Sequence, residues 1–138
     1  MIKDKKSLFI LLVEDEPNNL LLLTKLIKIE GIDKDQIISC ESDPSNIIDN
    51  IDKKIDLVFL DIHLPKKDGY QILKELRSNE KTKDAIIIAL TASVIEQDFE
   101  KAKLAGFDGF IGKPIDGRNF SETFQSIIEG KSIWSVKG

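Results

Sequence analysis

The chain has 138 residues, of which 41% are hydrophobic and 32% charged, and this composition excludes a disordered protein and suits one folded domain. A net charge of −4 without a run of basic residues argues against direct binding to nucleic acid. No apolar stretch is long enough to span a membrane, and no signal-peptide cleavage site follows the first apolar run. The only cysteine, Cys40, cannot form an internal disulfide, which fits a reducing compartment. We therefore expect a cytoplasmic protein that binds neither nucleic acid nor membrane.

Short apolar runs alternate with amphipathic segments along the chain, and these predict strands and helices respectively. The expected strands cover residues 8–13, 37–40, 56–60, 85–90 and 109–112, and the expected helices cover residues 17–30, 44–53, 69–79, 95–105 and 117–129. The run at 85–90 is almost entirely apolar, as in a strand that is covered on both faces. This order predicts an α/β fold of the (βα)5 type, a doubly wound five-stranded parallel sheet with helices on both faces.

The predicted elements form a single domain over residues 7–130. Gly130 suits the end of the last helix, because glycine is the commonest residue just after a helix. Residues 131–138 form a short tail that includes Trp134. The sequence leaves open whether this tail packs against the domain or frays.

Two of the predicted strands end in acidic residues. Glu14 and Asp15 follow the strand at 8–13, and Asp61 follows the strand at 56–60. The carboxyl ends of parallel strands lie at one edge of an open α/β sheet, where ligands bind. Carboxylates crowded at this edge repel one another unless a cation or a proton compensates their charge. The three acids are therefore candidates for a functional site, although each alone could be an ordinary solvated loop residue.

Two further strands bring different side chains to the same edge. Thr91 follows the strand at 85–90, and Lys113 follows the strand at 109–112. Carboxylate oxygens suit Mg²⁺, and a cation with a hydroxyl donor can hold a phosphoryl group during its transfer. A carboxylate can also act as the nucleophile and form an aspartyl-phosphate. Alone, Thr91 could be a turn residue and Lys113 a surface lysine, so only their joint placement indicates phosphoryl transfer.

Four short motifs carry these candidate residues. They are Val13-Glu14-Asp15-Glu16, the stretch Asp61-Ile62-His63-Leu64-Pro65-Lys66-Lys67-Asp68-Gly69, then Leu90-Thr91-Ala92 and Gly112-Lys113-Pro114. In their joint spacing, over roughly residues 7–129, the chain resembles the receiver domain of two-component response regulators. It is similar to single-domain regulators, which lack an output domain. The resemblance implies the flavodoxin-like, CheY-like architecture with strand order 2-1-3-4-5.

The resemblance also assigns roles to the acids. It implies that Asp61 is the phospho-acceptor, which takes a phosphoryl group from a phosphohistidine of a partner protein. Asp15 and Asp61 would bind Mg²⁺ directly, together with the main-chain carbonyl of His63. Glu14 would act on the same ion through a metal-bound water.

Other residues would respond to the phosphate. Lys113 would pair with one phosphate oxygen, and Thr91 would donate a hydrogen bond to another. Phe110 occupies the aromatic switch position of the family and would turn inward when Thr91 moves, although a phenylalanine in a short strand is more often a core residue. The positions of His63 and Ser93 influence in this family how long the phosphate survives, and we expect the His63 side chain to face solvent.

The partners follow from the same resemblance. A histidine kinase or a histidine phosphotransfer protein would supply the phosphoryl group, and Leu21 or Leu22 would contribute to the contact with it. A downstream protein would bind the surface of the last two helices and the last strand, at about residues 95–125. The protein would be a signalling switch that catalyses only its own phosphorylation and slow dephosphorylation.

Two other functions compete with this interpretation. A phosphatase of the haloacid dehalogenase type also uses an aspartate after an apolar strand, but it has a second acid two residues later, where this chain has His63. A degenerate receiver could serve as an adaptor that works without phosphate. The presence of all the expected site residues argues against the adaptor.

Overall fold

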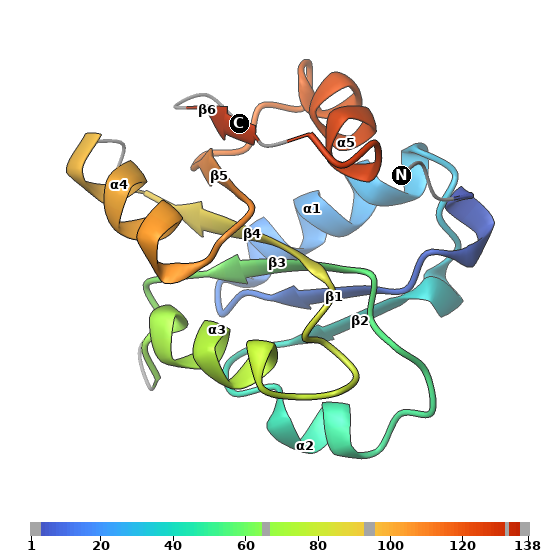
Figure 1. Cartoon of the computed structure of the whole chain (residues 1–138). Coiled ribbons are helices and arrows are strands. Elements are labelled where there is room, and N and C mark those ends of the chain that lie inside the picture. Colours follow the sequence, from blue (N-terminus) through green and yellow to red (C-terminus); the bar gives the residue numbers. More distant parts are fainter. Residues whose placement is uncertain (1–3, 65–66, 93–95, 132, 136–138) are drawn as a thin grey trace.

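The computed structural model describes residues 4–64, 67–92, 96–131 and 133–135. The strands are β1 (Ile10–Val13), β2 (Ile37–Cys40), β3 (Leu57–Asp61), β4 (Ile86–Thr91), β5 (Gly109–Gly112) and β6 (Ile133–Ser135). The helices are α1 (Pro17–Ile29), α2 (Ser45–Asp49), α3 (Gly69–Arg77), α4 (Glu96–Ala105) and α5 (Phe120–Ile128). The described strands form one parallel sheet in the order β2-β1-β3-β4-β5-β6 (Figure 1).

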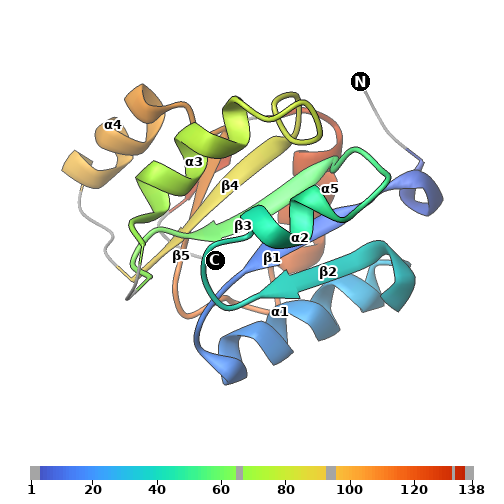
Figure 2. The same ribbon diagram turned by 90° about the horizontal axis from the view of Figure 1, so that it is seen from below.

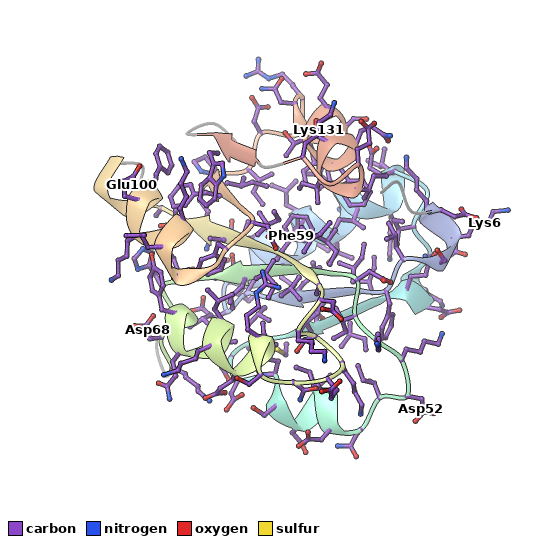
Figure 3. All side chains as sticks on the ribbon, in the orientation of Figure 1. Lys6, Asp52, Phe59, Asp68, Glu100 and Lys131 are labelled. Carbon is purple, nitrogen blue, oxygen red and sulfur yellow. The ribbon has the colours of Figure 1, made fainter. Side chains whose placement is uncertain are left out.

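Helices cover both faces of this sheet. Helices α1 and α5 pack on one face, and α2, α3 and α4 pack on the other, as the two views in Figures 1 and 2 show. Successive strand residues point to opposite faces, so each buried strand needs apolar residues at every position. In β1, Leu11 and Val13 belong to the layer shared with α2, α3 and α4, whereas Ile10 and Leu12 belong to the other layer. Phe59 of β3 lies in the interior between the sheet and α5 (Figure 3).

The predicted fold class is confirmed, because the five predicted strands have the order 2-1-3-4-5 and alternate with five helices. The sheet also has a sixth strand, β6, which the sequence did not predict. It forms within the tail at 131–138, where Trp134 stacks on a ring of β5. No helix within the described ranges is both long enough and apolar enough to cross a membrane.

Helices α2 and α5 differ most from the predicted ranges, and both are shorter. Helix α2 ends at Asp49, and the side chain of Asn50 donates to the carbonyl of Asn46 at 2.7 Å. Helix α5 begins at Phe120, because the residues before it form a turn in which the Asp116 carboxylate accepts the Arg118 N–H at 2.9 Å. In both places a short polar side chain binds the main chain locally, and this competes with regular helix geometry.

Candidate functional site

The candidate acids meet at the carboxyl edge of the sheet. Strands β1 and β3 are neighbours with Val13 opposite Leu60, so the residues that follow them emerge side by side (Figure 1). Carboxylate oxygens of Glu14, Asp15 and Asp61 all lie within 4.8 Å of one another. The parallel register thus brings together acids that are almost fifty residues apart in sequence.

Lys113 reaches this cluster from β5. Its main-chain N–H donates to the carbonyl of Thr91 at 2.7 Å, which fixes the start of the loop after β5. Its Nζ lies 2.8 Å from Asp61 Oδ2 and 2.7 Å from Glu14 Oε1. Glu14 and Asp61 are only 1% and 2% exposed, so the ammonium stabilises two carboxylates that water barely reaches. The Lys113-Pro114 peptide bond is cis.

Burial and hydrogen bonding act differently on the two buried acids. Burial raises the pKa of Glu14, and this effect exceeds the opposing effect of Lys113. Burial would also raise the pKa of Asp61, but hydrogen bonds from Lys113 and from the N–H of His63 outweigh it and lower that pKa. Burial would lower the pKa of Lys113, whereas its close contacts with the carboxylates of Asp61 and Glu14 raise it. These opposite shifts in pKa favour the ionised form of Asp61 more than that of Glu14.

The donor set fits a hard divalent cation. Three carboxylates lie close together and one ammonium contacts two of them, Glu14 and Asp61, so negative charge exceeds positive charge within this cluster. Glu14 Oε1 is buried and in ionic contact with Lys113, yet it accepts no hydrogen bond among the described residues. A buried oxygen without such a bond is costly unless another partner is provided. Oxygen ligands and surplus negative charge are what Mg²⁺ requires.

Thr91 is linked to the acids through His63. Thr91 is fully buried, and its Oγ1 lies 2.9 Å from the Nε2 of His63. The main-chain N–H of His63 donates to Asp61 Oδ1 at 2.9 Å. His63 is exposed overall, as expected, but its ring does not simply face solvent. This contact could not be predicted from residue spacing, because it depends on how the loop after β3 lies against the end of β4.

Phe110 is the second residue of β5 and lies two residues before Gly112, the end of that strand. It is fully buried, with its ring 4.4 Å from Phe99 and 6.4 Å from Trp134 between centroids. These contacts place it in the core, and its switch role stays a prediction. Pro65 of the second motif and Ser93 lie outside the described residues.

Gly69 is a site-forming residue whose role the sequence analysis did not recognise. It is the first residue of α3, and a Cβ there would lie 2.8 Å from the carbonyl oxygen of Asp61 and even closer to the main chain of Ile62. Only glycine therefore lets α3 begin directly against the backbone that carries Asp61. The motif around Asp61 contains this glycine, but residue spacing in the sequence does not reveal that the main chain at Gly69 packs against that of Asp61 and Ile62.

The family model for the response regulator receiver domain matches residues 10–125. This chain belongs to that family. The match includes all the residues of the acidic edge and all five predicted strands except the first two residues of the strand predicted at 8–13. Receiver domains are signalling switches, and the resemblance seen in the sequence is confirmed at the level of the family.

Individual relatives share this receiver domain in different contexts. The chain is 34% identical over 116 residues to the hybrid signal transduction histidine kinase L of Dictyostelium discoideum, matching 82% of this chain but 7% of the kinase. It is 29% identical over 119 residues to the polar-differentiation response regulator DivK of Brucella ovis, covering 86% of this chain and 94% of DivK. The chain thus spans a small part of the kinase and nearly all of DivK.

A solved receiver domain has the same fold and a metal in its cleft. The receiver domain of the sensor histidine kinase PA1611 from Pseudomonas aeruginosa superimposes with a TM-score of 0.73 at 27% identity, covering 88% of this chain and 98% of that domain. That structure has a magnesium ion coordinated in its active-site cleft. The acidic cluster of this receiver domain is of a kind that could bind the same ion.

We expect Gly69→Ala to destabilise this receiver domain by about 2 kcal/mol, because the added methyl group collides with backbone that cannot move freely. The helical propensity of alanine would otherwise favour the substitution. The free energy of unfolding in urea measures the effect.

Gly117→Ala is the matched control, since a Cβ there would meet only the flexible end of Leu26 at 3.4 Å. We expect this variant to unfold at nearly the wild-type urea concentration. Equal stability of both variants would contradict the steric role of Gly69.

Proposed function

We propose that this receiver domain accepts a phosphoryl group on Asp61 from a phosphohistidine of a partner protein. The observation that carries the proposal is the ion pair of Lys113 with Asp61 and Glu14 at 2.8 and 2.7 Å, in a buried cluster. It supplies an ionised nucleophile and a fixed positive charge for the incoming phosphate oxygens. Solvated loop acids would have neither the burial nor a shared ammonium.

The transfer is a displacement at phosphorus. A carboxylate oxygen of Asp61 forms the new P–O bond while the P–N bond to the partner's imidazole breaks, and the electron pair of that bond leaves with the ring nitrogen. Asp15, Asp61 and the main-chain carbonyl of His63 would hold Mg²⁺, and Glu14 would act through a metal-bound water. When bound, the ion would neutralise charge on the phosphoryl oxygens. The protein itself contributes position and charge rather than an acid or a base.

Two side chains would respond to the new charge. Lys113 already lies 2.8 Å from Asp61, so its ammonium is in place for a phosphate oxygen. Thr91 would exchange its contact with His63 for a hydrogen bond to the phosphate, because a charged acceptor makes the stronger bond. The phosphate thereby selects a second arrangement of the β4 end, and Phe110 is our candidate for passing this change to the protein surface.

Helix α1 is the proposed contact for the phosphate donor, a histidine kinase or a histidine phosphotransfer protein. Leu21 is 54% exposed and Leu22 is 37% exposed. Leu21 lines a shallow hollow together with Glu14 and Asp15. An apolar contact beside the acids would hold a phosphohistidine close to Asp61. The downstream protein is proposed to bind a different surface, formed by α4, β5 and α5.

Incubation with acetyl phosphate and Mg²⁺ is expected to add one phosphoryl group to the wild-type chain and none to Asp61→Asn. The amide of asparagine is not a nucleophile for phosphorus, and it lacks the charge that Lys113 stabilises. Intact mass spectrometry measures the adduct.

Asp52→Asn is the control for this experiment, because Asp52 is exposed and lies far from the sheet edge (Figure 3). It should be labelled as the wild type is. Absence of an adduct on the wild type would favour the phosphate-independent adaptor, and rapid turnover of small phosphate esters would favour the phosphatase.

His63→Ala is expected to leave phosphorylation intact and to lengthen the lifetime of the aspartyl-phosphate about fivefold, the equivalent of one hydrogen bond of about 1 kcal/mol. The ring competes with the phosphate for the Thr91 hydroxyl, so its removal favours the phosphorylated arrangement. Decay of the intact-mass adduct after removal of acetyl phosphate gives the lifetime. His63→Gln, which keeps a hydrogen-bonding side chain, should resemble the wild type, and equal decay rates in all three proteins would contradict this role.

Leu21→Ala is expected to slow phosphotransfer from the partner kinase about fivefold, because an exposed apolar contact is lost at the interface. Ile29→Ala is the matched control on the same helix, since Ile29 is 76% exposed but lies two turns away. Both variants should react normally with acetyl phosphate. Equal transfer rates from the kinase would argue against a contact at Leu21.

A further inference from the structure

Strand β6 covers the outer edge of β5. The two strands are parallel, with Trp134 opposite Phe110 and Ile133 opposite Gly109 (Figure 1). Because β6 has three residues and β5 has four, few main-chain hydrogen bonds can join them. A short strand at the edge of a sheet is among the first elements to open in a folded protein.

Trp134 anchors β6 through its ring. The ring is stacked on that of Phe110, with centroids 6.4 Å apart and an angle of 26° between the planes. Lys103 of α4 places its Nζ 5.1 Å from the centroid of the same ring. Phe99, also on α4, contacts Phe110 edge to face at 4.4 Å. The attachment of β6 therefore depends on where the Phe110 ring lies.

The register connects Phe110 to Thr91. Ala89 lies opposite Phe110 and Thr91 lies opposite Gly112, so Thr91 and Phe110 are diagonal neighbours on one face of the sheet. Gly112 has no side chain to separate them. Both residues are fully buried, and in a close-packed core a shift of one leaves space that the other can enter.

We propose that β6 is a gate on the edge of β5 that phosphorylation of Asp61 opens. The inference rests on the proposed function, because the phosphate is what draws the Thr91 hydroxyl away from His63. Phe110 then moves toward the space beside Thr91, and Trp134 loses its stacking partner. The freed edge of β5 presents unpaired N–H and C=O groups, to which an extended segment with an aromatic side chain can add as a strand.

Trp134 reports on the gate directly, because it is the only tryptophan of the chain. We expect acrylamide to quench its fluorescence about twofold more strongly after treatment with acetyl phosphate and Mg²⁺, since an undocked strand is open to solvent. Intact mass, measured on the same samples of the full chain, gives the fraction of protein that carries the phosphoryl group.

Two lysine variants on α4 test the anchor without phosphate. Lys103→Gln removes the cation from the Trp134 ring, and we expect stronger quenching in the unmodified protein. Lys101→Gln is the matched control, because its Nζ lies 4.5 Å from the ring of Tyr70 instead, and it should quench as the wild type does. Equal quenching in the two variants would contradict the anchoring of β6 through Trp134.

The measurements separate the gate from the function on which it rests. An adduct on the wild type with unchanged quenching would overturn the gate and leave the phospho-acceptor function intact. Absence of an adduct would overturn both. Asp61→Asn, treated in the same way, should show neither an adduct nor a change in quenching.

Discussion

The structure depends on the compensation of buried negative charge at one edge of the sheet. Glu14 and Asp61 are almost inaccessible to water, and two ionised carboxylates in contact would be strongly destabilising without a partner. Lys113 provides that partner from a different strand, at 2.7 and 2.8 Å. The order of β1, β3, β4 and β5 in the sheet is what lets three separate segments of chain share one charge cluster.

Lys113 compensates only part of the negative charge at this edge, which leaves the site suited to bind a further cation. The cluster has more negative than positive charge, and one buried oxygen of Glu14 lacks a hydrogen bond among the described residues. A cation and a phosphoryl group would therefore enter a site that is already arranged for them. The Thr91 hydroxyl contacts the ring of His63, and in the proposed function it would exchange this contact for one to the phosphate, which would give the end of β4 two arrangements. If the two arrangements differ little in free energy, a phosphoryl group on Asp61 would be enough to shift the population from one to the other.

Much of this could be predicted from the sequence because the signals are local. Apolar runs marked the strands, and the acids, Thr91 and Lys113 directly followed them. Parallel topology then places the ends of all strands at one edge. The predicted helix ends were wrong where a local polar contact competes with the helix, at Asn50 after α2 and at Asp116 before α5. The fate of the tail was left open by the sequence, because the stacking of Trp134 on Phe110 is a contact between distant residues.

The (βα)5 fold, the family and the identity of the charged groups at the sheet edge can all be read from the amino-acid sequence, because periodicity and strand-end position are properties of short segments. Which of these groups touch depends on the folded chain. The 2.9 Å contact of His63 with Thr91, the approach of Gly69 to the Asp61 carbonyl and the stacking of Trp134 on Phe110 each join residues that are distant in sequence or held by loop geometry. Such contacts depend on distances of a few tenths of an ångström in a close-packed interior, and residue spacing carries no information at that scale.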